Sequence, residues 1–195
     1  MTAKLDSILT DIRRCKICEA CLPHPPRPVV RAASSAKIII IGQAPGSKVH
    51  ESGVPWQDQS GSRLREWTGL DETTFYDASR VALMPMGFCY PGAADGADLP
   101  PRPECAPLWH PRVLALLPKI RLTLLVGIHA QTHYLRNRAK STMTETVRAF
   151  SAFGPAQFPL PHPSWRSTGW MRRNPWFEEE VLPALRRNVR SALAL

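Results

Sequence analysis

The stretch that decides the fold covers residues 38–61, IIIIGQAPGSKVHESGVPWQDQSG. Its four consecutive isoleucines, residues 38–41, are typical of a strand buried on both faces, as in a parallel sheet. The glycines of the following turn, residues 42–46, let backbone N–H groups approach a ligand without interference from Cβ atoms. Because ligands bind beyond the carboxyl ends of strands in open α/β sheets, the sequence predicts an active-site loop here.

The segments on either side alternate between helical and extended patterns around a proline-rich linker. We expect helices over residues 5–18, 60–69 and 104–117, and strands over residues 37–42, 80–84, 122–127 and 158–160. Asn174 is expected to cap a last helix with Pro175 at its first position, and Pro183 to kink or restart that helix. Three loops that follow strands should then converge on one edge of the sheet.

Length and charge narrow the class of protein. With 195 residues, 44% of them apolar, the chain suits one folded α/β domain over residues 1–195. The net charge of +9 favours a polyanionic partner such as nucleic acid, although a basic protein without such a partner fits the charge equally well. No apolar run approaches the roughly 18 residues of a membrane span, and the N-terminus is amphipathic, so we expect a cytoplasmic protein.

The chain contains five cysteines, an odd number that disfavours a disulfide framework in a reducing compartment. Cys15 and Cys18 form a C-x-x-C pair, and fifteen residues, 90–104, separate Cys89 from Cys105. Four soft ligands in two segments suit a metal site, for which spacing alone favours tetrahedral zinc. Four ordinary thiols are the competing interpretation, and Cys21 is left over.

The chain contains three motifs in order: GQAPG at residues 42–46, GVPWQDQSG at residues 53–61 and HPS at residues 162–164. Together they resemble the motifs of the uracil-DNA glycosylase superfamily. With the cysteine pairs, the arrangement is similar to the iron–sulfur branches, families four and five. The resemblance implies an α/β three-layer sandwich with a central, mainly parallel four-stranded sheet flanked by helices. It also implies a monomer and a [4Fe-4S] cluster held by Cys15, Cys18, Cys89 and Cys105, in preference to zinc.

The implied activity is that of a monofunctional glycosylase acting on DNA. Such an enzyme flips out a deaminated base, most often uracil, and hydrolyses its N-glycosidic bond, leaving an abasic site. The site must stabilise a positive sugar and a negative departing base, and basic loops must hold phosphates. The alternative is a metal-stabilised protein that binds damaged DNA without turnover, which needs the aromatic and basic residues but no carboxylate that activates water.

Two residues of the second motif carry the expected chemistry. The resemblance aligns Trp56 with an aromatic residue that stacks on the extruded base, whereas the competing interpretation is a core tryptophan. Asp58 matches an aspartate that is associated with activating water, and an ionised carboxylate there would also oppose the positive charge of the sugar. Asp58 can instead cap the helix that starts near Ser60.

The third motif supplies the expected contact to the departing base. His162 resembles a histidine that hydrogen-bonds the uracil carbonyl, a role that a neutral imidazole fills as a donor; a structural histidine is the alternative. In the WRSTGWMRR stretch, residues 165–173, Trp165 or Met171 is a candidate wedge for the gap left by the flipped base. Ser164, Arg166, Arg172 and Arg173 are expected to contact phosphates, unless these arginines are simply solvated.

Two departures from the family pattern affect the expected base contacts. Gln43 stands where family-four members carry Glu, and Ala44 where the best-known branch carries its catalytic Asp, which strengthens the case for Asp58. Relatives often recognise uracil with an Asn a few residues before the third cysteine, whereas this chain has MPMGFC at residues 84–89. The expected base-binding groups are therefore Gln43, Ala44 and Trp56 with the backbone near Gly87 and Phe88.

Overall fold

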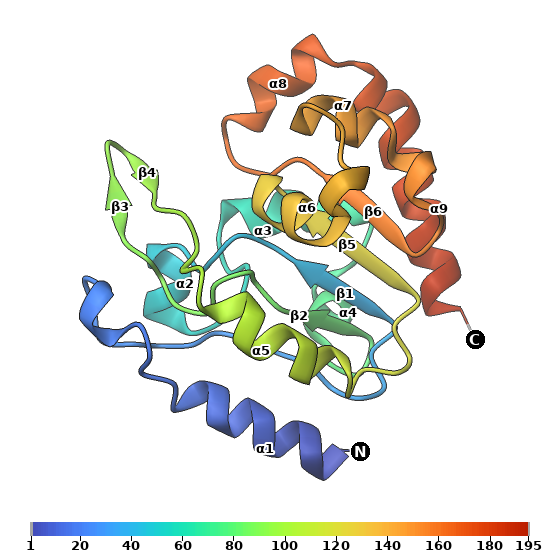
Figure 1. Ribbon diagram of the computed structural model, residues 1–195. Coiled ribbons are helices and arrows are strands. Elements are labelled where there is room, and N and C mark those ends of the chain that lie inside the picture. The colour runs from blue at the N-terminus through green and yellow to red at the C-terminus, as the bar shows by residue number, and fades with distance from the viewer. Residues whose placement is uncertain (1, 195) are drawn as a thin grey trace.

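A four-stranded parallel sheet forms the centre of the computed structural model, which describes residues 2–194 (Figure 1). Its strands are β1 (Ile38–Ile41), β2 (Val81–Leu83), β5 (Leu122–Val126) and β6 (Gln157–Leu160). They lie in the order β2-β1-β5-β6, and every neighbouring pair is parallel. The four predicted strands and the mainly parallel sheet are therefore confirmed, with strand ends differing by one residue at most.

Helices cover both faces of the sheet and give the predicted three-layer sandwich (Figure 1). One face is covered by α1 (Thr2–Arg13), α5 (Cys105–Leu114) and α6 (Ile128–Leu135). The other is covered by α3 (Gln59–Thr68), α4 (Glu72–Tyr76) and α9 (Leu182–Leu193). The predicted helices over residues 5–18, 60–69 and 104–117 correspond to α1, α3 and α5, although α1 ends five residues earlier than expected.

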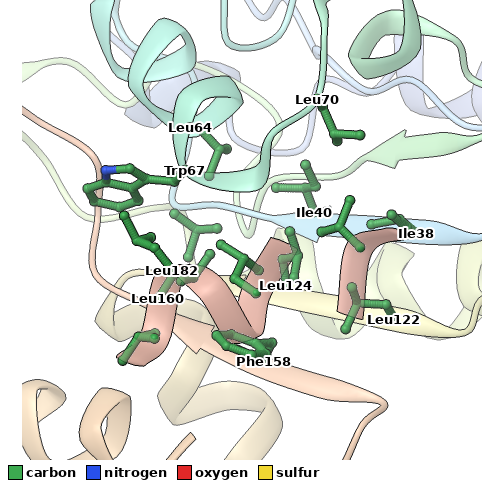
Figure 2. Packing of buried hydrophobic residues seen from close by; sticks show 14 of the residues in the cluster. Ile38, Ile40, Leu64, Trp67, Leu70, Leu122, Leu124, Phe158, Leu160 and Leu182 are labelled. Carbon is green, nitrogen blue, oxygen red and sulfur yellow. The ribbon is translucent and has the colours of Figure 1, made fainter. Parts of the chain in front are cut away.

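The isoleucines of β1 explain why the sheet has two cores. Ile38 and Ile40 pack into the cluster under α3 and α9, whereas Ile39 and Ile41 pack into the cluster under α1 and α5. Figure 2 shows the first of these clusters, with Ile38 and Ile40 beside residues of β5, β6, α3 and α9. All four side chains are fully buried, and each such burial contributes roughly 1.5–3 kcal/mol.

Several shorter elements lie outside the sequence prediction. They are η1 (Glu19–Cys21), α2 (Ser47–Ser52), β3 (Ala93–Ala94), β4 (Ala97–Asp98), η2 (Arg136–Arg138), α7 (Met143–Arg148), η3 (Phe150–Phe153) and α8 (Ser167–Arg173). Strands β3 and β4 form an antiparallel hairpin that projects from the carboxyl edge of the sheet (Figure 1). Asp95 and Gly96 have positive φ angles of 51° and 72°, as the two-residue turn of a tight hairpin requires.

The last helical segment differs in part from expectation. Asn174 ends α8 instead of capping the next helix, because its side-chain amide donates to the carbonyl of Trp170 at 2.8 Å. The chain then forms a π-helical turn, η4 (Phe177–Val181), and continues as α9 with Pro183 in its first turn. The backbone stays helical through Val181 and Leu182, so the change expected at Pro183 is a passage from π-helical to α-helical hydrogen bonding instead of a new start. Within residues 2–194, no helix has both the length and the apolar character that crossing a membrane requires.

Candidate active site

The loops that follow β1, β2 and β6 meet at the carboxyl edge of the sheet, as the sequence predicted. There they enclose a pocket of about 260 Å³ together with the β3–β4 hairpin and the start of α3. Eight of the predicted site residues line it: Gln43, Ala44, Trp56, Asp58, His162, Ser164, Trp165 and Arg166. Residues that are far apart in the sequence thus form one concave surface, the position where open α/β sheets bind ligands.

The loops after β1 and β2 are joined by backbone hydrogen bonds. The N–H of Met86 donates to the carbonyl of Gly42 at 2.9 Å, and the N–H of Gly87 donates to that of Gln43 at 3.0 Å. Phe88 is buried, and its carbonyl accepts from Val29 at 2.8 Å. Gly87 and Phe88 do not belong to the pocket lining. The N–H of Gly87 and the carbonyl of Phe88 are engaged elsewhere, so the structure does not bring these two predicted base contacts to the pocket.

A buried histidine that sequence reasoning missed holds this loop in place. His110 lies 3.1 Å by its Nε2 from the carbonyl oxygen of Pro85 and 2.6 Å by its Nδ1 from the hydroxyl of Tyr134. Since a carbonyl can only accept, Nε2 carries the proton and Nδ1 accepts from Tyr134. Burial lowers the pKa of His110 to about 4, so the ring remains neutral. His110 thereby fixes Pro85, a residue of the pocket wall.

Trp56 is held in an unusual backbone conformation at the pocket wall. Its φ angle is 60°, in the left-handed region that bulky residues rarely adopt, and its carbonyl accepts from the hydroxyl of Tyr76 at 3.1 Å. The half-buried indole covers Gly42, where a Cβ atom would come within 2.6 Å of the ring. The ring therefore packs against the core and also lines the pocket, and its stacking on an extruded base stays a prediction.

Asp58 begins helix α3 and also lines the pocket. Its Oδ1 accepts from the N–H of Gly61 at 2.8 Å, the hydrogen bond of an N-cap. The predicted capping role is therefore confirmed. Its negative charge nevertheless acts on two neighbours in the pocket: burial lowers the pKa of His162 and Asp58 partly opposes this, whereas burial raises the pKa of Asp98 and Asp58 adds to it. A cap fixes the position of the carboxyl group and leaves it further lone pairs, so capping and chemistry are compatible.

His162 follows β6 and lies between Trp56 and the end of β5. Its ring centroid is 5.9 Å from that of Trp56, and a Cβ atom on Gly127 would lie 3.5 Å from its own Cβ. Burial lowers the pKa of His162, and the neighbouring Asp58 raises it only in part. Burial thus favours the neutral imidazole, which can donate a hydrogen bond without bringing a full charge.

The β3–β4 hairpin supplies a second carboxyl group, that of Asp98, which sequence reasoning missed. The hairpin is attached to both walls of the pocket. Gln43 donates through Nε2 to the carbonyl of Leu99 at 3.3 Å, and Arg166 donates through Nη2 to that of Gly96 at 3.3 Å. The Asp95-Gly96 dipeptide is the sequence signal that could have revealed the turn.

The predicted DNA-binding residues, phosphate contacts and wedge candidates together, divide into two groups. Ser164, Trp165 and Arg166 lie at the pocket, where Trp165 is 71% exposed with the Arg166 guanidinium 4.8 Å from its ring centroid. Arg63 from α3 fixes this loop by donating to the carbonyl of Ser164. The second group, Met171, Arg172 and Arg173, lies in the last turns of helix α8 (Ser167–Arg173). Met171 and Arg172 line a separate hollow beside α3 and α9, and Arg173 is exposed, so the structure does not bring them to the pocket.

The four predicted cysteine ligands come together around a second, small cavity. Cys15, Cys18, Cys89 and Cys105 line it together with apolar side chains, whereas Cys21 is exposed outside it. Burial, with the negative charge of neighbouring cysteines, raises the pKa of Cys18 and of Cys89 to about 11. Within residues 2–194, no three His, Cys, Asp or Glu side chains are arranged to hold a single metal ion. The donor set itself, four soft sulfurs on one cavity, fits an iron–sulfur group.

Comparison with known protein families agrees with this geometry. Residues 30–186 match the uracil DNA glycosylase superfamily. The match covers well over half of the chain, so the protein belongs to this superfamily, whose members are DNA glycosylases. The matched region contains the sheet, the pocket and two of the four cysteines, while α1, Cys15 and Cys18 precede it.

Proposed function

We propose that this protein is a monofunctional DNA glycosylase that extrudes a deaminated base, uracil foremost, and hydrolyses its N-glycosidic bond. The observation that supports this most is the meeting of Trp56, Asp58 and His162 in one pocket at the carboxyl edge of the sheet. An aromatic surface, a carboxylate and a neutral imidazole are the groups that base stacking, water activation and leaving-group stabilisation require.

Each side chain has a separate part in the reaction. The extruded base stacks on the pocket surface of Trp56, whose backbone is fixed by Tyr76. Asp58, fixed as the cap of α3, orients a water molecule toward C1′ of the sugar and opposes the positive charge that develops there. His162 donates a hydrogen bond to a carbonyl oxygen of the base as negative charge moves onto it.

The activity is tested with purified protein and labelled oligonucleotides that carry uracil, hypoxanthine, xanthine or a G:T mismatch. Alkaline cleavage after incubation reveals abasic sites. We expect strand breaks at uracil in wild-type protein and none in DNA with normal pairs. The capping bond of Asp58 also favours a second function, binding of damaged DNA without turnover, in which Asp58 is structural only. Retention of damaged DNA with no abasic product would select that function.

We further propose that Cys15, Cys18, Cys89 and Cys105 hold a [4Fe-4S] cluster, with zinc as the chemical alternative. Supporting this, the four thiols line one cavity, and four soft sulfur donors are the ligand set that such a cluster uses. The cluster would supply structure, joining the N-terminal segment to the loop that carries the hairpin. The proposed steps of catalysis use only protein side chains and water.

The cluster proposal predicts a brown protein when purification excludes oxygen, with broad absorption near ~400 nm. Cys89→Ala should lose the colour and melt at a lower temperature, because one ligand is lost. Cys21→Ala is the matched control and should keep both, since Cys21 is exposed outside the cavity. Elemental analysis provides the measurement. Zinc without iron would contradict the proposed [4Fe-4S] cluster. Absence of both metals would contradict any metal site at these cysteines.

The basic end of α8 predicts a measurable electrostatic contribution to DNA binding. Replacing Arg172 and Arg173 together by Ala should reduce the slope of log affinity against log salt by roughly 0.9 per lost phosphate contact on duplex DNA. Base preference should stay the same, because phosphate contacts position the duplex only. The control replaces the exposed Arg13 and Arg14 together by Ala, which removes the same charge at the end of α1, on the opposite face of the sheet from α9. Equal slopes for both double variants would place the DNA surface elsewhere.

A further inference from the structure

Arg27 connects helix α2 with the cavity that the four predicted cysteine ligands line, called the cysteine cavity below. It stands in the sequence PPRP, residues 25–28, where Pro28 favours an extended backbone at Arg27. Side chains of neighbouring residues in an extended chain point in different directions. Pro26 and Pro28 accordingly line the cysteine cavity, whereas the exposed side chain of Arg27 reaches α2 instead.

The guanidinium of Arg27 holds the C-terminal end of α2 (Ser47–Ser52). Its Nη1 donates to the carbonyls of His50 and Glu51, both at 2.6 Å, which are among the last carbonyls that a helix leaves without a partner. Gly53 leaves room for this group, since a Cβ atom there would stand 2.8 Å from Nη2 of Arg27. A helix this short is marginal by itself, so α2 depends on such contacts.

The position of α2 determines part of the base pocket. Gly46 caps the N-terminus of α2 and Val49 lies within the helix, and both residues line the pocket. The carbonyl of Gly46 accepts from the N–H of His50 at 2.8 Å, so the helix is joined to the end of the loop after β1. A displacement of α2 would therefore move one wall of the pocket.

The backbone of Arg27 contacts the cysteine site at the same time. Its N–H donates to the sulfur of Cys89, and this contact partly opposes the rise in the pKa of Cys89 that burial causes. His24 adds a second connection, because its ring centroid lies 5.3 Å from that of His50 in α2 and 5.9 Å from that of Tyr90, the residue after Cys89. One short segment thus touches both sites.

We propose that Arg27 is a positioning residue that couples occupancy of the cysteine site to the affinity of the base pocket; this inference rests on the proposed function and its proposed cluster. When a metal group holds the four cysteines together, residues 26–28 are fixed and Arg27 keeps α2 in place. When the group is lost, Arg27 loses its fixed contact with Cys89, its side chain no longer holds α2, and the pocket wall loosens. The metal group thereby affects base binding as well as stability, without entering the reaction.

The test measures DNA affinity in four proteins: wild type and Arg27→Ala, each with its metal and after anaerobic chelation. The probe is an oligonucleotide with the 2′-fluoro nucleotide of the base that wild type excises, because the fluorine disfavours positive charge on the sugar and the base stays attached. Metal removal should weaken binding by wild type by about tenfold, a usual strength of coupling between sites. Arg27→Ala should bind weakly from the start, and metal removal should change its affinity by less than about twofold.

Arg121→Ala is the matched control. Arg121 is also exposed and also donates through Nη1 to a carbonyl at the C-terminal end of a helix, that of Ala194 at 2.6 Å, but it lines neither cavity. Arg121→Ala should keep the wild-type affinity and the full response to metal removal. Equal responses of wild type and Arg27→Ala, in proteins whose circular dichroism shows intact helices, would overturn the coupling.

A second measurement uses only metal-loaded protein, so it does not require the metal-free protein to stay folded. Because coupling between two binding sites is reciprocal, the bound oligonucleotide should raise the chelator concentration that removes half of the metal. This protection should disappear in Arg27→Ala and remain in Arg121→Ala; equal protection in all three proteins contradicts the role of Arg27. If wild-type protein excises no base of the panel, the glycosylase function itself has failed. A wild-type protein without metal would instead overturn the cluster, and the coupling with it.

Discussion

Asp58→Asn is expected to lower the single-turnover excision rate by about two to three orders of magnitude while leaving the fold intact. Asparagine caps helices as well as aspartate does, so the hydrogen bond from the Gly61 N–H to residue 58 is preserved. The amide, however, cannot accept a proton from water or oppose the charge of the sugar. Binding of damaged DNA, measured by titration, should change little because the carboxylate acts mainly in the transition state.

The matched control for this experiment is Asp71→Asn. Asp71 caps α4 through the Thr74 N–H at 2.7 Å, the same arrangement as that of Asp58, but it lies outside the pocket. Asp71→Asn should leave both excision and melting temperature near wild type. Excision by Asp58→Asn at the wild-type rate would show that Asp58 serves only as a cap and that another group drives hydrolysis.

Gly61→Ala is expected to destabilise the protein by about 3 kcal/mol or more, because the core cannot accommodate even one methyl group there. The new Cβ atom would stand 1.7 Å from the carbonyl oxygen of Trp56, so the backbone of residue 56 must move. Denaturant unfolding measures the loss. Because Trp56 already has a φ angle of 60°, this movement should also displace the indole and weaken binding of DNA that carries an extruded base.

The control for Gly61→Ala is the same substitution at Gly169, in the middle of α8. The nearest atom to its Cβ position is 4.0 Å away, on the flexible end of Arg173. Gly169→Ala should therefore stabilise the protein by roughly 0.5–1 kcal/mol, the usual gain of alanine over glycine in a helix. A Gly61→Ala protein that unfolds at the wild-type denaturant concentration would mean that Trp56 relaxes freely.

Local sequence patterns predicted those parts of the fold that depend on buried apolar runs. Residues 38–41 and 122–126 are apolar throughout or nearly so, and parallel pairing then brings their following loops to one edge. The hairpin escaped prediction because its strands are two residues each and exposed, so they show no alternation. Helix α7 had a detectable signal, the capping box from Thr142 to Glu145.

The candidate site was predictable only where a motif carried it. Trp56, Asp58 and His162 were found through their motifs, and the pocket gathers them. His110 has no such local signature, since its role depends on the distant Pro85 carbonyl that it meets. Asp98 reaches the pocket only because the hairpin carries it there. For the same reason, the sequence could not show that Gly87 and Phe88 lie outside the pocket lining. The sequence does not reveal that the N–H of Gly87 is already donated to the carbonyl of Gln43.

The strand order has a consequence for the rate at which this chain folds. Strand β1 (Ile38–Ile41) is central, and its neighbour β5 (Leu122–Val126) is translated only after some eighty further residues have been made. Until then, four isoleucines that are fully buried in the native protein lack one pairing edge. Such long-range parallel pairing folds slowly, and a short apolar segment of high β-propensity is prone to aggregate while it is exposed. The same residues that secure the sheet therefore make the nascent chain dependent on low concentration or on chaperones.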